Sequence, residues 1–492
     1  MVTIKHVQKY DCDVLIAGGG PAGSGLAFHL ASKGYKVIVV ESEKFPRDKV
    51  CGDGVSPIAL AELNAMGITD TEKFAKANEI SRVGLFIKND KVFINLSKPE
   101  HLPFHARIIP RIELDNWIYE AAKNAGAQYI ESTRVINYSI TSNGAIAELK
   151  QGQKNYKLKA RIIVGADGSS STIARQMHGA KPKDEFQLLG LRTYYENVNG
   201  PTDRVDIYFT GESFPGIFWM FPKGPHAANI GMAMVSKTLP YKPTHVKELL
   251  AAHIKDNPDI AERIGSGKIN GKIDGWPITF FNAQSSITGN RIMLVGDAAG
   301  LINPLSGDGV QYALLSARWA SETLKACLQK NDFSAEALYA YRKKVDAEVG
   351  YDFALSNLLV QFPRNKTFTP VWMAILSVMI STAKKDKNYA DIIAGIFEGT
   401  YPSHKALTLS FIIKSLKQGG KDFEKAVTEI LKKPNSAIEN GLQISQTALQ
   451  ILEGIKDHPR EHGKWAINTA SKTISVAGHV IKNIGRNKKQ AV

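Results

Sequence analysis

The glycine-rich stretch at residues 18–23, Gly-Gly-Gly-Pro-Ala-Gly, has the residue types and spacing that bind the pyrophosphate of a dinucleotide. An apolar run at 14–17 precedes it, a segment with apolar residues at helical spacing follows it, and a second apolar run at 37–40 ends at Glu41. Glycines allow a tight turn and close approach of the pyrophosphate, which then meets free N–H groups at the start of a helix. Glu41 can accept hydrogen bonds from a ribose and would repel a 2′-phosphate, so NADP is disfavoured at this site.

Two later stretches favour FAD over NAD as the dinucleotide. Residues 159–175 read as a buried strand followed by Asp167, and residues 290–314 as a strand ending at Asp297 before a long helix that starts near Gly309. An aspartate at the carboxyl end of a strand, beside a helix N-terminus, can hold a sugar-alcohol chain and the electron-rich edge of a flavin. For each stretch alone the alternative is an aspartate cap and a turn, but three such stretches in this order predict FAD.

The sequence KVCGDGVSP at 49–57 places a cysteine beside two glycines and an aspartate. Each glycine weakens a helix or strand, so this segment reads as a loop whose backbone passes close to another group. The thiol of Cys51 has two interpretations. It is either an inert packed side chain, as most free cysteines are, or a group that positions or protonates something bound beside it.

Composition limits the class of protein. The 492 residues are 43% hydrophobic and 22% charged, which suits a soluble chain of two or three domains. The three cysteines, Cys12, Cys51 and Cys327, form no closely spaced pair and no cluster with histidine, so we expect neither disulfides nor a metal site. The small number of cysteines also leads us to expect a cytoplasmic protein. The longest apolar run, at 368–383, is too short to span a membrane. The net charge of +15 favours an anionic partner, and because no nucleic-acid-binding motif is visible we expect no nucleic acid.

These motifs together resemble the flavoproteins of the para-hydroxybenzoate hydroxylase type, which use the same three segments to hold FAD. Within that group, PRDKVCGDGVSP at 46–57 and GIFWMFPKG at 216–224 resemble the geranylgeranyl reductase family, and the similarity covers roughly residues 11–350. The resemblance implies an α/β fold with a Rossmann-like FAD-binding domain of discontinuous segments. It also places the Cys51 loop against the flavin.

Carried over residue by residue, the resemblance implies a cofactor site. The implied contacts with the pyrophosphate and the adenosine are Gly18, Gly20, Ala22 and Gly23 of the dinucleotide loop, Glu41 on the ribose and the backbone of Val135 on the adenine. The loop residues Cys51, Gly52 and Gly54 would lie against the flavin, and Arg111 is a further implied contact with FAD. Asp297, Gly309 and Val310 would meet the ribityl chain and the isoalloxazine. Cys51 is the implied catalytic residue. Without the resemblance, Arg111 reads equally well as a solvated arginine at the start of a helix.

The aromatic motif of the family, Tyr-x-Trp-x-Phe-Pro-x-Gly, is altered in this chain. Trp219 and Phe221 match it and would wall the substrate site, whereas the alternative is that they pack as one face of a strand in the core. Ile217 occupies the tyrosine position, which changes the shape expected of a prenyl cavity.

The motifs and composition divide the chain into an FAD-binding domain, a β-sheet substrate domain and a helical, basic C-terminal region. The expected bounds are 1–80, 105–180 and 286–345 for the first, 81–104 and 181–285 for the second, and 346–492 for the third. Residues 384–492 hold 18 Lys/Arg against 10 Asp/Glu, a surplus of 8 positive charges.

A helical stripe of apolar residues stands out in the tail: Ile467, Ala470, Ile474, Ala477, Ile481 and Ile484. Basic residues occupy the other faces. Two interpretations are open, a helix that docks on the protein with a solvated basic face, or a helix in peripheral contact with a membrane.

The expected activity is that of an FAD-dependent reductase, which transfers a hydride from reduced flavin to a C=C bond of an isoprenoid chain. The resemblance implies a geranylgeranyl chain on a lipid, pigment or quinone precursor as substrate, and NAD(P)H or ferredoxin as electron donor. The alternative is an aromatic monooxygenase or halogenase on the same fold, although flavin halogenases usually carry Trp-x-Trp-x-Ile-Pro where this chain has its aromatic motif. A membrane adaptor without catalysis rests only on the basic tail.

Overall fold

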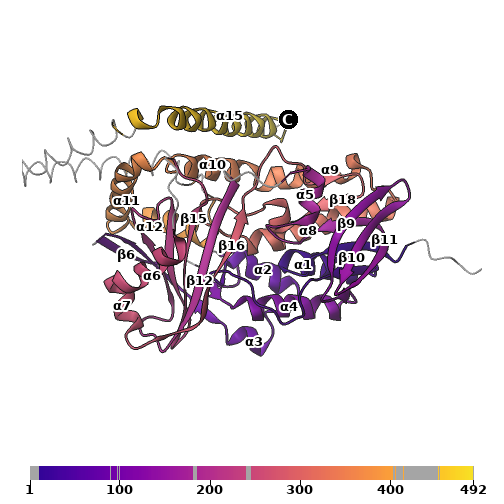
Figure 1. Ribbon diagram of the computed structural model, residues 1–492, viewed down its shortest axis with the longest axis horizontal. Coiled ribbons are helices and arrows are strands. Elements are labelled where there is room, and N and C mark those ends of the chain that lie inside the picture. The colour runs from indigo at the N-terminus through magenta and orange to yellow at the C-terminus, as the bar shows by residue number, and fades with distance from the viewer. Residues whose placement is uncertain are drawn as a thin grey trace, which may run out of the picture.

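The computed structural model describes residues 10–88, 90–96, 98, 100–180, 186–239, 245–402, 405, 414, 453 and 455–490, with side chains as far as 479. Two large sheets lie side by side, and helices from the C-terminal half cover them (Figure 1). This is the α/β fold expected from the sequence, with a Rossmann-like sheet next to a second, largely antiparallel one.

The larger sheet carries the dinucleotide motif. Its strands run in the order β17-β18-β11-β1-β2-β8, and β10 and β9 extend from β11 as an antiparallel arm. The central pairs are parallel, and burial on both faces explains their continuous aliphatic sequences. The strands are β1 (Cys12–Ala17), β2 (Val37–Val40), β8 (Gln128–Ile130), β9 (Arg134–Thr141), β10 (Gly144–Gln151), β11 (Lys154–Gly165), β17 (Thr288–Gly289) and β18 (Ile292–Leu294).

Helices on this sheet share one hydrophobic cluster with its strands. α1 follows β1 directly and packs against both α4 and α8, so the dinucleotide turn is held between strand and helices. The helices of this part are α1 (Pro21–Ala31), α4 (Arg111–Asn124), α5 (Thr172–His178), the 3₁₀ helix η2 (Gly296–Ala299), α8 (Val310–Lys330), α9 (Ala335–Glu348) and α10 (Gly350–Gln361).

The second sheet has seven strands in the order β16-β12-β15-β14-β13-β5-β6. Every neighbouring pair is antiparallel except β13 with β5, which is parallel. The strands are β5 (Arg82–Ile87), β6 (Asp90–Asn95), β12 (Gln187–Glu196), β13 (Arg204–Phe209), β14 (Gly216–Gly224), β15 (Ala227–Val235) and β16 (Lys268–Thr279). One face packs on α6 (Val246–Asp256) and α7 (Pro258–Ile264), and the other on α11 (Thr369–Ala383) and α12 (Lys387–Glu398).

A small antiparallel sheet joins the two large ones. It consists of β3 (Gly54–Val55), β7 (Ala106–Ile108) and β4 (Asn78–Ile80), and the helices α2 (Pro57–Ala65) and α3 (Glu72–Ala75) follow β3. Both β4 and β7 pack against β14. Because β3 begins three residues after Cys51, this sheet brings the Cys51 loop to the strand that carries the aromatic motif.

The C-terminal helix α15 (Pro459–Gln490) lies along α10 (Figure 1). The indole N–H of Trp465 donates to the Gln361 carbonyl at 3.0 Å, and Lys472 lies over the Phe186 ring. The apolar stripe points away from this contact, since Ile467 is 70% and Ile474 is 73% exposed. A helix docked through its apolar stripe is therefore wrong for the part that is described; Ile481 and Ile484 lie beyond the described side chains. Among the residues described, the helices are all too short or too polar to cross a membrane.

Candidate functional site

The turn between β1 and α1 is closed tightly by two glycines. Gly18 has φ +101°, and a Cβ there would lie 2.3 Å from the carbonyl oxygen of Ala166. A Cβ on Gly23 would lie 1.9 Å from the carbonyl oxygen of Gly18. Both contacts are with backbone, which cannot move aside without opening the turn. The predicted dinucleotide turn is therefore present, with glycine required by its geometry.

Glu41 ends β2 beside this turn and is only 6% exposed. Its Oε2 accepts the Gly19 N–H at 2.7 Å, so the carboxylate fixes the turn itself. The backbone carbonyl of Glu41 accepts the Thr133 N–H at 2.8 Å, which brings the start of β9 alongside. Val135, the predicted adenine contact, is buried two residues further on. The structure thus places Glu41 and Val135 at the same end of the sheet as the glycine turn.

The residues around the N-terminus of α1 fit the pyrophosphate of FAD. Gly20 is the N-cap residue of α1, and no side chain forms a capping hydrogen bond there. The first turn of α1 also has no acidic residue, so its backbone N–H groups remain available to bind an anion. The Arg47 guanidinium lies 3.6 Å from the position of a Gly20 Cβ and adds positive charge. These donors would hold the pyrophosphate, while Glu41 would face the ribose.

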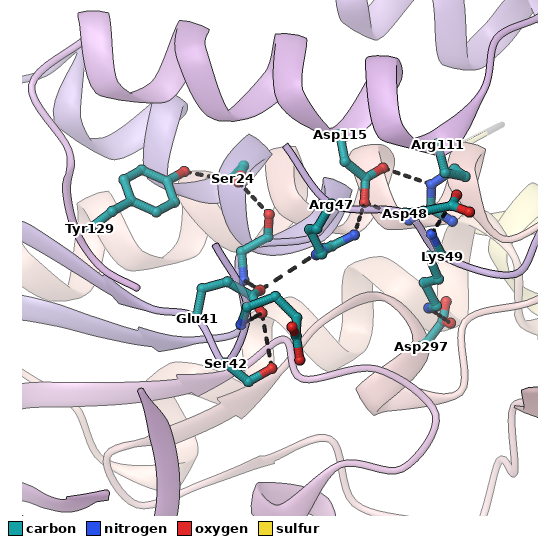
Figure 2. Close-up of polar contacts among 12 residues, drawn as sticks. Ser24, Glu41, Ser42, Arg47, Asp48, Lys49, Arg111, Asp115, Tyr129 and Asp297 are labelled. Atoms are coloured by element: carbon teal, nitrogen blue, oxygen red, sulfur yellow. Dashed lines mark hydrogen bonds and ion pairs between the residues drawn. The ribbon is translucent and has the colours of Figure 1, made fainter. Parts of the chain in front are cut away.

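A buried ion network connects this turn with α4, and Figure 2 shows Arg47 between Glu41 and Asp115. Arg47 lies 2.6 Å from Asp115 and 3.9 Å from Glu41. Arg111, only 5% exposed, holds both oxygens of Asp115 at 2.6 and 2.9 Å. Burial alone would raise the pKa of Asp115, but the two guanidinium groups outweigh it and hold that pKa below its usual range. The interpretation of Arg111 as a solvated residue is therefore wrong.

The Cys51 loop lies between Arg111 and the aromatic strand. The positive charge of Arg111 acts on the Cys51 thiol and favours its thiolate form. A Cβ on Gly52 would lie 3.3 Å from the Phe221 ring and 3.6 Å from Trp219, so the loop backbone passes close to both rings. Burial raises the pKa of the Cys51 thiol above its usual range although Arg111 opposes the shift. Cys51 is accordingly a protonated thiol at neutral pH.

Trp219 and Phe221 project from the same face of β14 as Ile217, because side chains alternate along a strand. Their rings are 6.0 Å apart, and the Trp219 indole N–H donates to Asn229 Oδ1 at 2.9 Å. Ile217 and Phe221 pack toward the cluster of α11 and α12. Phe221 therefore has a core-like environment on one side and the Cys51 loop on the other, and Trp219 lies against the same loop.

Asp297 lies in η2, at the opening of the last motif. Its Oδ2 accepts hydrogen bonds from Lys49 Nζ and Ser169 Oγ, each at 3.3 Å. Gly309 caps α8, and a Cβ there would lie 3.5 Å from Asp297 Oδ1. Val310 is buried in a hydrophobic cluster with α2 and α4, so any flavin contact there would use its backbone.

The last motif meets the first through Gly296. A Cβ on Gly296 would lie 2.7 Å from Cβ of Ala22, the first residue after Pro21 in α1. The first and the last of the three predicted FAD segments thus lie in contact. Among the glycines predicted to contact the cofactor, Gly54 is the least closely packed, because a Cβ added there would lie 3.9 Å from the Phe221 ring.

Three polar residues of this region carry no motif and were not predicted: Asp53, Tyr194 and Asn229. The Asp53 carboxylate accepts hydrogen bonds from the Tyr194 hydroxyl at 2.7 Å and the Asn229 amide at 2.8 Å. Asp53 was visible within the CGDG sequence, but nothing local distinguished its role. Tyr194 and Asn229 come from β12 and β15, more than 140 residues away, so only the fold reveals them.

Replacing Asp297 by alanine is expected to weaken FAD binding by about 1.5–3 kcal/mol, because a charged hydrogen-bond acceptor for the ribityl chain is lost. Asp297→Asn, which keeps an acceptor oxygen without the charge, should lose less. The measurement is a fluorescence titration of the apoprotein with FAD. Wild-type affinity in Asp297→Ala would contradict the assignment of Asp297 to the cofactor.

Comparison with known proteins agrees with this geometry. A sequence model of the family described as "FAD binding domain" matches residues 11–347. The chain is 29% identical over 321 residues to a menaquinone reductase of Mycolicibacterium smegmatis, covering 63% of this chain and 76% of that protein. It is 28% identical over 354 residues to digeranylgeranylglycerophospholipid reductase 2 of Methanopyrus kandleri, covering 69% and 84%.

Solved structures share the fold. A geranylgeranyl bacteriochlorophyll reductase-like protein of Thermoplasma acidophilum superposes with a TM-score of 0.62 at 22% identity, over 86% of this chain and 98% of that one. A halogenase solved in complex with FAD superposes with a TM-score of 0.57 at 18% identity, over 92% and 96%. At these identities the likeness concerns the fold alone, and reductases and halogenases have it in common.

Proposed function

This chain belongs to the FAD-binding domain family, and from that membership we propose that it is an FAD-dependent reductase that saturates C=C bonds of an isoprenoid chain. The observation that carries the proposal is the position of the Cys51 loop. One side of that loop meets Arg111 in the predicted cofactor site, and the other lies against Trp219 and Phe221. This arrangement supports a thiol held between a flavin site and an apolar wall.

Different residues of the chain would bind the substrate and supply the proton in such a reaction. Bound FAD, once reduced, supplies a hydride to one carbon of the double bond. The aromatic side chains of Trp219 and Phe221 exclude water and bind an apolar chain beside the loop. Cys51, whose pKa is raised by burial, holds a proton close to that wall for the other carbon. Electrons would come from NAD(P)H or ferredoxin.

We propose a geranylgeranyl chain as the substrate, carried by a lipid or quinone precursor. By their names, one relative reported above reduces a digeranylgeranylglycerophospholipid and the other a menaquinone, which supports a lipid or quinone class of substrate. Ile217, in place of the tyrosine of the family motif, removes a hydroxyl from the aromatic wall. The wall is then apolar at that point, which suits an unfunctionalised hydrocarbon chain.

Oxygen chemistry is the second candidate, because a halogenase shares the fold. The two are separated by supplying NAD(P)H in air with and without a geranylgeranyl compound. The proposal predicts slow, substrate-independent oxygen uptake and no hydroxylated or halogenated product. Rapid oxygen uptake coupled to hydroxylation of an aromatic compound would favour the monooxygenase instead.

We also propose peripheral contact with an anionic membrane through α15. Its exposed face presents Ile467 and Ile474, and the C-terminal region of the chain is basic. A helix with apolar side chains outward and positive charge nearby suits the interface of a bilayer that contains the proposed lipid substrate.

The double variant Ile467→Ser/Ile474→Ser is expected to bind anionic liposomes at least about tenfold more weakly, since each buried isoleucine contributes about 1.5–3 kcal/mol. Because both side chains are exposed, flavin content and thermal stability should not change. Cosedimentation with liposomes at several salt concentrations measures the effect. Ile269→Ser, at an exposed position of β16, is the matched control. Equal binding by the double variant and the control would contradict membrane contact through α15.

A further inference from the structure

Asp53 is a fully buried carboxylate two residues from Cys51. Its backbone has φ +63°, a left-handed conformation that few residues other than glycine, asparagine and aspartate adopt readily. Oδ2 accepts both hydrogen bonds of the carboxylate, from Tyr194 and Asn229. Oδ1 is buried and has no hydrogen-bond partner among the residues described. Packing alone does not explain a buried carboxylate with one unpartnered oxygen and a left-handed backbone.

Asn229 joins Asp53 to the proposed reaction site. Its amide nitrogen donates to the Asp53 carboxylate and also to the Cys51 carbonyl, each at 2.8 Å. Its amide oxygen accepts the Trp219 indole N–H at 2.9 Å. One side chain thus ties the carboxylate, the Cys51 loop and the aromatic wall together.

The two arginines that face Asp53 each pair with another carboxylate. Arg111 from α4 faces it, but that guanidinium already holds both oxygens of Asp115. Arg192 from β12 faces it as well, but pairs with Asp48. Among the described residues Asp53 forms no ion pair. Within the Cys51 loop, the charge of Asp53 acts on the titratable thiol of Cys51.

We propose that Asp53 is a positioning residue that holds the Cys51 loop and places a buried negative charge beside the Cys51 thiol. This inference rests on the proposed function, in which that thiol is an acid. The proton leaves Sγ as the S–H bond breaks and forms a C–H bond at one alkene carbon. Bound reduced FAD would supply the hydride, with its electron pair, to the other carbon, and the Cys51 thiolate would regain a proton from water.

The state of Asp53 at working pH fits this role. Burial raises the pKa of Asp53 to about 6, so the carboxylate is ionised at pH 8. Burial is the largest cause of the raised pKa of the Cys51 thiol. The negative charge of Asp53 raises that pKa further, whereas Arg111 and a hydrogen bond with the Asp53 backbone lower it. Tyr194, which donates to Asp53, keeps its proton at this pH because its own pKa is raised by burial and by Asp53.

Asp53→Asn removes the charge with little change of shape. Asparagine tolerates the left-handed backbone, and its oxygen can take the place of Oδ2 and accept both existing hydrogen bonds. Its NH₂ group would then stand where Oδ1 has no partner now. Asp53→Gly is the second variant, because glycine suits φ +63° and removes the carboxylate altogether.

The test is the rate at which iodoacetamide alkylates Cys51 in the FAD-loaded protein, followed by peptide mass spectrometry from pH 6 to 10. Cys12 and Cys327 are buried and stay unreactive. In both variants the rate at pH 8 should rise roughly threefold or more, since the gain in thiolate outweighs its lower nucleophilicity. Asp259→Asn, which removes a surface carboxylate paired with Lys91, should behave as wild type.

An unchanged or slower alkylation profile in folded, flavin-bound Asp53→Asn and Asp53→Gly would overturn the proposal. The measurement needs no alkene, so its outcome is separate from the proposed function. Faster alkylation in a protein that fails to saturate any isoprenoid would leave the Asp53 effect standing and remove the reductase assignment.

Discussion

Replacing Gly23 by alanine is expected to yield protein without bound FAD and with a clearly lower melting temperature. The new Cβ would lie 1.9 Å from the Gly18 carbonyl oxygen and 3.2 Å from Cβ of Ala166. Since the nearest atom is backbone, the turn between β1 and α1 must open, at a cost of about 1–3 kcal/mol or more. Flavin absorbance after gel filtration and thermal unfolding measure the two effects.

Gly20→Ala is the matched control within the same turn. Gly20 has an ordinary φ of −69°, and the nearest atom to an added Cβ is on Arg47 at 3.6 Å. The melting temperature of the apoprotein should therefore stay near wild type. FAD affinity should still fall, because the methyl group would stand where the pyrophosphate approaches the backbone. A Gly23→Ala protein with full flavin content and wild-type stability would contradict the structure of this turn.

Removing the thiol of Cys51 has the second large expected effect. Cys51→Ala should retain FAD yet slow reoxidation of the reduced flavin by a geranylgeranyl substrate by about 10²–10⁴-fold, the usual contribution of a general acid. Cys51→Ser keeps a hydrogen-bonding group beside Arg111 and should be less severe. Anaerobic stopped-flow absorbance of the flavin gives both rates.

Cys327→Ala is the matched control for this pair, because Cys327 is a buried thiol of α8 that belongs to the core of the larger sheet. It should reoxidise at the wild-type rate. If both Cys51 variants also react at that rate, the thiol is a packing group and the proton comes from elsewhere.

The parts of this fold that the sequence predicts are those whose signals are local. The turn at Gly18–Gly23 combines a strand, a helix and an acid within thirty residues, and β1, α1 and β2 lie where these patterns indicate. The start of α8 follows in the same way from Gly309. Asn229 and Tyr194 have no such signal, because each acts on the Cys51 loop only after two sheets have been brought together.

Orientation was the other feature that the sequence left open. Periodicity found the apolar stripe of α15 but cannot tell which side of the helix meets the protein. The docking contacts come instead from Trp465 and Lys472. The Trp465 indole N–H donates to the Gln361 carbonyl, and the Lys472 ammonium group lies over the Phe186 ring. Similarly, the sequence left open whether Arg111 at the start of α4 contacts the cofactor or is solvated. The structure shows it buried and paired with Asp115, one helical turn on.

The central claim is that reduced flavin in this protein gives its hydride to an isoprenoid double bond. The direct measurement is anaerobic mixing of the dithionite-reduced, FAD-loaded protein with a geranylgeranyl lipid, and separately with the fully saturated phytanyl lipid. The account predicts return of oxidised flavin absorbance with the first compound only, and a product with two added hydrogens for each double bond reduced. Flavin that stays reduced with a range of geranylgeranyl lipids and quinones, and no saturated product by mass spectrometry, would contradict it.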